Sequence, residues 1–210
     1  MSCECKSTDH APRLVVLTGG PGAGKTAVLE IVKRNFCEHV QVLPEAASIV
    51  FGGGFPREVS LAWRRAAQRA IYRVQRELER GALEAGGAAV VLCDRGTVDG
   101  VAYWPPDDAS FWPDVGSSLE SELARYSAVI HLRTPTADGG YGRANPLRIE
   151  TAREAAAVDE RIGAAWARHP RCAIVANAPD FLTKVANAVA LIREQVPPCC
   201  RKHRIPEVDT

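Results

Sequence analysis

Short apolar runs alternate with segments of helical periodicity along most of the chain. The run R-L-V-V-L-T at 13–18 is continuously apolar and β-branched, which predicts a strand buried on both faces. Similar runs predict further strands at 40–43, 88–93, 127–132 and 172–176. Apolar residues recur at helical spacing near 25–36, 59–85, 117–125, 149–168 and 180–195. This alternation predicts a three-layer α/β domain, a parallel sheet with helices on both faces.

Two stretches rich in turn residues resemble linkers, W-P-P-D-D-A-S-F-W-P-D at 104–114 and T-P-T-A-D-G-G-Y-G-R-A-N-P at 134–146. Each follows a predicted strand, and loops at the carboxyl ends of parallel strands are where such folds bind ligands. The ends of the chain lack periodicity, so we expect flexible segments at 1–12 and 197–210. The remaining 13–196 form a single predicted domain.

Composition and charge narrow the range of partners. The 210 residues are 46% hydrophobic and 24% charged, with a formal net charge of +1. Such a balance provides no field for capturing polyanions, so we expect no nucleic-acid partner. No apolar run approaches the ~20 residues of a membrane span, and the polar N-terminus lacks the apolar core of a signal peptide. We therefore expect a cytoplasmic protein, as a monomer or a dimer.

The segment G-G-P-G-A-G-K-T at 19–26 matches the phosphate-binding loop (P-loop, or Walker A) pattern G-x-x-x-x-G-K-[ST] in full. It lies between a predicted buried strand and an amphipathic helix, as that motif requires. Its glycines let successive N–H groups point at phosphate oxygens, and Lys25 can reach the β- and γ-phosphates. The predicted nucleotide contacts are Gly19, Gly20, Gly22, Ala23, Gly24, Lys25, Thr26 and Ala27.

Asp94 ends the third predicted strand, in L-C-D-R-G-T-V-D-G. Mg²⁺ held by one hydroxyl, here that of Thr26, usually needs an acid on a neighbouring strand. We therefore predict a Mg²⁺ site formed by Thr26 and Asp94. The alternative is that Asp94 only caps a following helix.

Several P-loop classes are disfavoured because their motifs are missing. A GTPase would show D-x-x-G after the third strand, but Thr97 stands three residues beyond Asp94. Nor does the fifth strand lead into N-K-x-D, since A-N-A-P-D follows it, and no L-S-G-G-Q signature of transporters occurs. These absences favour the small-molecule kinases among P-loop proteins.

A kinase must stabilise the phosphoryl group in flight and cover it against water. The 134–148 loop carries Arg143 and Arg148 with glycines for hinges, which predicts a lid. The alternative is a surface loop with two solvated arginines. Arg95 is predicted to face the acceptor cleft, unless it forms a structural ion pair.

The chain resembles one family of P-loop proteins. The resemblance rests on the P-loop, the second strand ending in P-E-A-A, a helix with R-A-A-Q-R-A-I-Y-R-V-Q-R-E-L-E, and V-V-L-C-D-R-G-T-V-D-G-V-A-Y-W-P. The family contains the ribosylnicotinamide-kinase domain of NadR and the insect TRPL-translocation-defect protein, and it is similar more distantly to thymidylate and deoxynucleoside kinases. The resemblance covers about 13–193 and implies a five-stranded parallel sheet in the order 2-3-1-4-5.

The same resemblance implies roles for the acceptor side. Glu45 matches the acid that serves as general base toward the acceptor hydroxyl, although it could instead cap the helix that begins at P-E-A-A. Arg64 and Gln75 match positions on the helix that lines the acceptor pocket. Asp99 recurs in the family motif and could position Arg95 or bind a water on Mg²⁺.

We therefore expect a Mg²⁺-dependent protein that binds ATP (or GTP) and transfers its γ-phosphoryl group to a small nucleoside-like or other hydroxyl acceptor. The alternative is a regulatory protein that hydrolyses nucleotide slowly and binds a partner or lipid. The insect relative implies peripheral contact with phosphoinositides.

Seven cysteines are many for a reducing compartment. Cys37, Cys93 and Cys172 lie in or beside apolar segments and are predicted to be core residues. The other four cysteines lie near the ends of the sequence, Cys3 and Cys5 at one end and Cys199 and Cys200 at the other, where His203 is close by. The predicted topology brings both termini to the end of the sheet opposite the nucleotide. These terminal residues could bind zinc, form a disulfide or remain exposed thiols. The pairs C-x-C and C-C lack the spacing usual for zinc ligands, so the sequence does not decide among the three.

Overall fold

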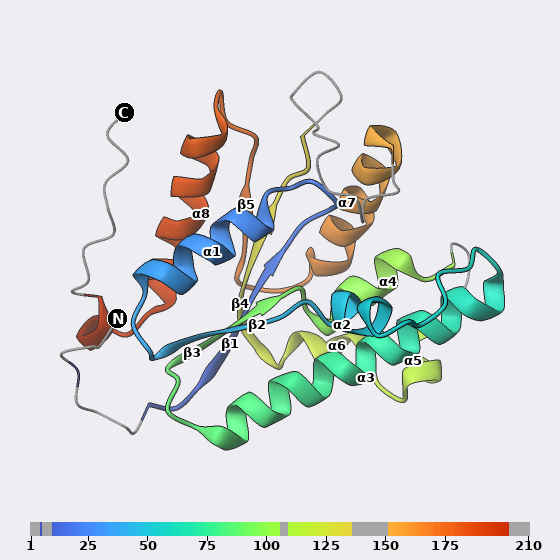
Figure 1. Ribbon diagram of the computed structural model, residues 1–210, viewed down its shortest axis with the longest axis horizontal. Helices are drawn as coiled ribbons and strands as arrows, with labels where there is room; N and C mark the ends of the chain where they lie inside the picture. Colours follow the sequence, from blue (N-terminus) through green and yellow to red (C-terminus); the bar gives the residue numbers. More distant parts are fainter. Residues whose placement is uncertain (1–4, 6–9, 106–108, 136–150, 202–210) are drawn as a thin grey trace.

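A five-stranded parallel sheet forms the centre of the protein (Figure 1). The computed structural model describes residues 5, 10–105, 109–135 and 151–201. The strands lie in the order β2-β3-β1-β4-β5, which confirms the predicted topology. Their bounds are β1 Arg13–Thr18, β2 Val40–Leu43, β3 Val90–Asp94, β4 Tyr126–Leu132 and β5 Cys172–Val175.

Helices cover both faces of the sheet because β1, at its centre, is apolar on both sides. Val15 and Leu17 pack toward α1 (Lys25–Asn35) and α8 (Phe181–Gln195). Leu14 and Val16 pack toward α3 (Leu61–Ala85) and α7 (Ala152–Trp166). Burying each such side chain stabilises the fold by roughly 1.5–3 kcal/mol. The sheet is thus held between two apolar layers, with its loops left to carry polar groups.

Besides α3, the described chain between β2 and β4 forms four short helices and a 3₁₀ turn. They are α2 (Ala46–Gly52), η1 (Thr97–Asp99), α4 (Gly100–Tyr103), α5 (Phe111–Val115) and α6 (Leu119–Leu123). None of the helices in the described ranges is both long enough and apolar enough to cross a bilayer.

Within the stretch at 104–114, which resembles a linker in the sequence, the described residues Trp104 and Phe111 are packed into the protein. Trp104 and Phe111 are 3% and 2% exposed, and their rings lie 5.2 Å apart. Tyr72 contacts the Phe111 ring edge-on from α3. Burial of these large aromatic side chains stabilises the fold more than the neighbouring prolines and other turn residues favour an exposed loop. Trp104 is therefore a core residue.

The first residues of the 197–210 segment, for which we expected flexibility, contact the domain. Pro198–Cys200 form a 3₁₀ turn, η3, after α8. Cys200 is 3% exposed and belongs to the core between α1 and α8, because its thiol packs as a small apolar group. Residues 202–210 lie outside the described residues.

Two carboxylates without exposed surface, Glu79 and Glu122, lie beneath the loop after β3. Arg125 forms ion pairs with both. Thr97 of η1 donates to Glu122 at 2.8 Å, and Tyr126 donates to Glu79 at 2.8 Å. Further donors are Tyr72, Gln75, Arg76 and Ser117. Buried charges persist only when paired and hydrogen-bonded, and this network ties η1 to α3 and α6.

Removing one charge of this network should destabilise the fold. Glu122→Gln should lower the free energy of unfolding by about 3 kcal/mol or more at pH 7, because it removes the negative charge that Arg76 and Arg125 pair with and replaces one acceptor oxygen of the buried network by an amide donor. Chemical denaturation measures this change. The exposed neighbour Glu120, 65% exposed in its ion pair, provides the control, and Glu120→Gln should change the value by less than about 0.5 kcal/mol.

The loss of stability in Glu122→Gln should depend on pH. Burial alone would raise the pKa of Glu122, but hydrogen bonds from Ser117, Tyr72 and Thr97 lower it to about 2. The folded pKa lies below the ordinary value of 4.5, so the stabilisation is present above about pH 4.5 and is lost as pH falls toward 2. The difference between wild type and Glu122→Gln should therefore shrink at pH 3. An undiminished difference there would contradict this role of the Glu122 charge.

Candidate functional site

The loop between β1 and α1 has the backbone of a phosphate cradle. Gly19, Gly22 and Gly24 adopt positive φ angles of 143°, 79° and 101°. A Cβ atom at Gly19 would lie 2.2 Å from the carbonyl oxygen of Leu132, and one at Gly24 would lie 2.8 Å from the Phe181 ring. Only glycine fits these positions without strain. The local sequence therefore builds the curve that turns successive N–H groups inward.

Lys25 begins α1, and its ammonium group lies within the loop. Its Nζ donates to the carbonyl oxygens of Gly19 at 3.1 Å and Gly20 at 3.5 Å. Burial, together with the positive charge of Arg95, lowers the pKa of Lys25 to about 8, while Asp94 opposes that shift. A phosphate group bound here would supply an opposite charge and raise this pKa.

Asp159 on α7 braces the P-loop from the side. Its Oδ1 accepts from the Gly20 backbone N–H at 2.9 Å and contacts His131 Nε2 at 2.8 Å. Arg133 Nε lies 3.2 Å from Oδ2. Burial would raise the pKa of Asp159, but the His131 and Gly20 hydrogen bonds lower it. The carboxylate is therefore charged and holds one P-loop amide in place.

Sequence reasoning missed Asp159 because no motif contains it. One feature could have revealed it. Asp159 is 2% exposed and lies among the buried residues of α7, where Ala155, Ile162 and Trp166 share the apolar face. A single acid on an apolar face indicates a buried partner.

Arg95, after β3, has the only positive φ among the described non-glycine residues, 73°. That region costs a side-chain-bearing residue about 1–3 kcal/mol and persists only where surrounding contacts impose it. Here Nε donates to Glu45 Oε1 at 2.7 Å, and Nη1 donates to the Gly19 carbonyl oxygen at 3.1 Å. Asp99 Oδ1 lies 3.8 Å from Nη1. The structure thus brings Glu45, Arg95 and Asp99 together beside the P-loop.

Glu45 occupies the N-cap position of α2, but its side chain does not cap the helix backbone. The carboxylate instead accepts from Arg95 and, at 2.5 Å, from the Ser48 hydroxyl. Burial would raise the pKa of Glu45, but the charge of Arg95 and the Ser48 hydrogen bond lower it to about 2. The carboxylate is therefore ionised at any pH near neutral.

Asp94 has an oxygen suited to a hard cation. Its Oδ1 is buried and accepts no hydrogen bond from any residue in the described part of the chain. Burial raises the pKa of Asp94, an effect that Lys25 opposes. Thr26 stands next to Lys25 in the first turn of α1 with its side chain exposed. A buried oxygen without a donor, together with a hydroxyl, fits the oxygen-ligand chemistry of Mg²⁺.

Asp99 shapes the loop that carries Arg95. It accepts from the Gly96 backbone N–H at 2.8 Å and from the Thr18 hydroxyl. Arg95 Nη1 lies 3.8 Å from Asp99 Oδ1, so the carboxylate is near the guanidinium that it could position.

Of the other two predicted acceptor-side residues, Gln75 belongs to the buried network, whereas Arg64 contacts Tyr103, whose ring lies 5.4 Å from the Arg95 guanidinium. Gln75 is 3% exposed, and its amide nitrogen donates to Glu79 at 2.7 Å in the buried network. Arg64 donates to the Tyr103 carbonyl oxygen at 3.4 Å. Within the described residues, neither forms a hydrogen bond or ion pair with Glu45 or Arg95. The predicted lid residues Arg143 and Arg148 lie outside the described residues.

The brace provided by Asp159 should matter for nucleotide affinity. Asp159→Ala should weaken binding of a non-hydrolysable ATP analogue by roughly 10–100-fold, since a hydrogen bond to a charged group contributes about 1.5–3 kcal/mol. Isothermal titration calorimetry measures this affinity, and circular dichroism checks folding. The adjacent Glu160 is 69% exposed, so Glu160→Ala is the matched control. Equal affinities of the two variants would refute the bracing role.

Solved structures of known proteins share this fold. The crystal structure of NadR protein in complex with NR aligns with a TM-score of 0.66 and 14% identity, covering 89% of this chain and 52% of that one. The crystal structure of NadR protein in complex with NAD and AMP-PNP aligns with a TM-score of 0.59 and 14% identity, covering 88% of this chain and 49% of that one. This chain thus spans about half the length of those NadR chains. Thymidylate kinase from Candida albicans gives 0.59 and 14%, covering 88% of this chain and 92% of that one.

Sequence comparison agrees with the fold. Among curated proteins, none matches the chain significantly. The AAA_28 family, described as an AAA domain, matches residues 14–183. This segment begins at the second residue of β1 and ends in the first turn of α8, so it contains β2 to β5, the P-loop and the Glu45–Arg95–Asp99 cluster. Because the match covers most of the chain, the protein belongs to this family of P-loop AAA domains.

Proposed function

We propose that the protein is a Mg²⁺-dependent phosphotransferase, which moves the γ-phosphoryl group of ATP (or GTP) to a hydroxyl of a small, nucleoside-like acceptor. The observation that carries this proposal is the Glu45–Arg95 pair, held against the P-loop carbonyl of Gly19. A carboxylate and a guanidinium beside a phosphate loop are what proton removal and phosphoryl stabilisation require.

The nucleotide would bind through the P-loop amides and Lys25, with Asp159 keeping the Gly20 amide in place. Phe181 lies against Gly24 and is 52% exposed, so it offers an apolar ring face for the nucleotide base. Nucleotide binding by this fold is supported by the NadR protein with which it aligns, whose crystal structure is a complex with NAD and AMP-PNP.

Mg²⁺ would be held by Thr26 and Asp94, whose buried Oδ1 is suited to it. When bound, the ion supplies positive charge to the phosphate oxygens. Arg143 and Arg148 are proposed to add further positive charge from the 134–148 loop.

Glu45 would accept the proton of the acceptor hydroxyl. A carboxylate with a pKa of about 2 is a weak base, and this low pKa depends on the contact with Arg95. An acceptor or phosphoryl oxygen that draws Arg95 away would return the pKa of Glu45 toward 4.5 and make it a stronger base. The ion pair is then the resting state, and substrate binding activates the base.

Glu45→Gln tests the proposed base. Because general-base catalysis contributes about 10²–10⁴-fold, the variant should lower acceptor-dependent ADP release by at least about 100-fold while analogue affinity stays within about threefold. A coupled ADP assay with a panel of nucleosides and other small hydroxyl compounds measures the release. Glu30, half-exposed on α1, provides the control variant Glu30→Gln, which should behave as wild type.

Two outcomes would reject this proposal. One is unchanged acceptor-dependent release in Glu45→Gln. The other is a wild-type protein that releases ADP no faster with any acceptor than with water, which would favour a nucleotide-dependent binding protein with slow hydrolysis.

Asp94→Asn tests the metal site. The variant should raise the Mg²⁺ concentration needed for half-maximal ADP release by about tenfold or more, because a neutral amide binds a hard cation more weakly than a carboxylate does. Titration of Mg²⁺ at saturating ATP measures this midpoint. The surface residue Asp114, paired with Arg69, gives the control Asp114→Asn. A midpoint in Asp94→Asn equal to that of the control would remove Asp94 from the site.

A further inference from the structure

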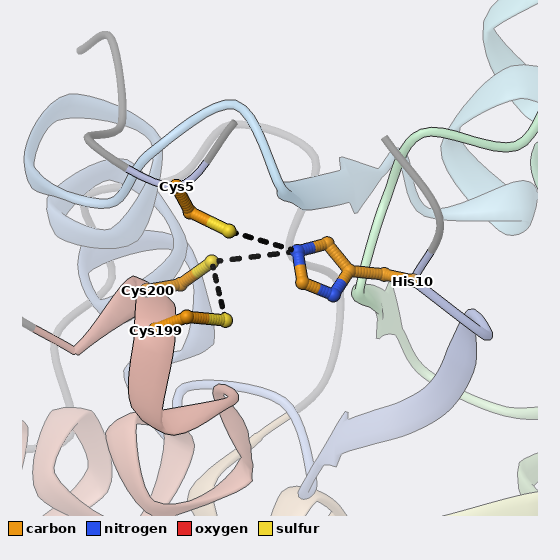
Figure 2. A group of neighbouring side chains, drawn as sticks. All are labelled: Cys5, His10, Cys199 and Cys200. Atoms are coloured by element: carbon orange, nitrogen blue, oxygen red, sulfur yellow. Dashed lines mark hydrogen bonds between the residues drawn. The ribbon is translucent and has the colours of Figure 1, made fainter. Parts of the chain in front are cut away.

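We propose that Cys5, His10, Cys199 and Cys200 form a zinc site that joins the two ends of the chain. The four side chains converge on one point in Figure 2. Cys5 and His10 precede β1, whereas Cys199 and Cys200 lie in η3, after α8. This proposal is independent of the proposed phosphotransfer.

The ligand atoms already have nearly the spacing of a tetrahedral centre. Zinc bonds of about 2.3 Å to sulfur and 2.0–2.1 Å to nitrogen imply edges of about 3.8 Å between sulfurs and 3.6 Å between sulfur and nitrogen. Cys199 Sγ and Cys200 Sγ are 3.8 Å apart. His10 Nε2 lies 3.5 Å from Cys5 Sγ and 3.8 Å from Cys200 Sγ.

The remaining separations need little adjustment. All four ligand atoms lie within 4.8 Å of one another, so closing the tetrahedron requires a side-chain movement of about 1 Å. A disulfide between Cys199 and Cys200 is not formed, because their 3.8 Å separation is far longer than an S–S bond of about 2.05 Å.

The donor set selects the metal. Three thiolates and one imidazole are soft or borderline ligands, which favour Zn²⁺ over the hard Mg²⁺ of the proposed nucleotide site. Four protein ligands fill a tetrahedral zinc shell and leave no position for water or substrate. The site is therefore structural rather than catalytic.

His39 lies next to the site, where it can hydrogen-bond to one of the proposed ligands. Its Nδ1 lies 3.3 Å from Cys200 Sγ, and its ring meets that of His10 edge-on with centroids 4.8 Å apart. His39 is 7% exposed. With the proton on Nδ1, it donates to the Cys200 thiolate, the kind of outer hydrogen bond that orients a metal ligand.

A second grouping competes for Cys200. Cys37, His39 and Cys200 also place their ligand atoms within 4.8 Å of one another. This grouping supplies only three ligands among the described residues, and all three are buried. Cys37 and Cys200 are also members of the apolar core. The four-ligand set is favoured because it completes a tetrahedron and includes the exposed Cys199.

The site would staple the termini far from the nucleotide. Figure 1 shows η3 at the end of the molecule opposite the loop that joins β1 to α1. His10 and Cys200 are 190 residues apart in the sequence. A metal that binds only the folded chain stabilises it by mass action, without touching the P-loop.

Metal content is the first test. The full chain, purified without chelator and with any histidine tag removed, should contain about one zinc per protein by mass spectrometry of the metal. Replacement by Co²⁺ should give the intense visible bands of tetrahedral cobalt bound to thiolates. Less than about a tenth of an equivalent of zinc, with no such bands on adding Co²⁺, would overturn the proposal.

Single substitutions then test the ligands. Cys199→Ser and Cys5→Ser should weaken Zn²⁺ binding by more than the roughly 10–100-fold that loss of an outer partner costs. Cys199 is exposed, so its replacement should leave the fold intact by circular dichroism. Cys172→Ser, in β5, is the matched control and should bind as wild type.

Cys37→Ser separates the two groupings. The proposed site predicts normal zinc content in this variant and loss in Cys199→Ser. The reverse result would place the ion in the Cys37 grouping and overturn the proposed ligand set.

Thermal unfolding tests the role of the site. A strong chelator should lower the midpoint of the wild type by on the order of 10 °C and leave Cys199→Ser unchanged. Affinity for the ATP analogue should remain within about threefold in both. An unchanged wild-type midpoint would contradict a stabilising zinc site.

Discussion

The guanidinium of Arg95 joins the parts of the candidate site to one another. It bonds to Glu45 at the start of α2 and to the Gly19 carbonyl of the P-loop, with Asp99 alongside. Its left-handed backbone costs free energy, which these charge-assisted contacts offset. Because one cation contacts both sides, a ligand that moves Arg95 alters the charge around Glu45 and the P-loop together.

Two buried acidic groups hold the loops on which Arg95 depends. Asp159 fixes the Gly20 amide on one side. Glu122, in the network with Glu79, holds Thr97 of η1 and so supports the loop after β3 from below. Each carboxylate is buried in an apolar layer and persists because arginine, histidine or hydroxyl donors surround it. The fold thus uses internal charge to position surface loops.

The sequence predicted the elements whose causes are local. Apolar runs indicated the five strands, because a strand buried on both faces is apolar at every position. Helical periodicity indicated the long helices, because each buries only one face. The P-loop was predictable because its glycines and Lys25 are adjacent along the chain. The sequence did not predict α5, which begins at Phe111, because the surrounding residues are typical of turns. The aromatic cluster that stabilises this helix includes Tyr72 of α3, which is distant in the sequence. Asp159 was missed because its partners come from other elements.

By itself, the sequence determined the alternation of strands and helices, the phosphate cradle and the types of side chain available at each loop. Only the tertiary structure decided which of those side chains meet. Glu45 and Arg95 are 50 residues apart, and His10 and Cys200 are 190 residues apart. Such pairs leave no periodicity, because their distance depends on strand order and on how α8 returns beside α1, and not on the local chain. The sequence suggested that the cysteines of the two ends could meet, but it paired them with His203, and only the fold showed that His10 lies among Cys5, Cys199 and Cys200.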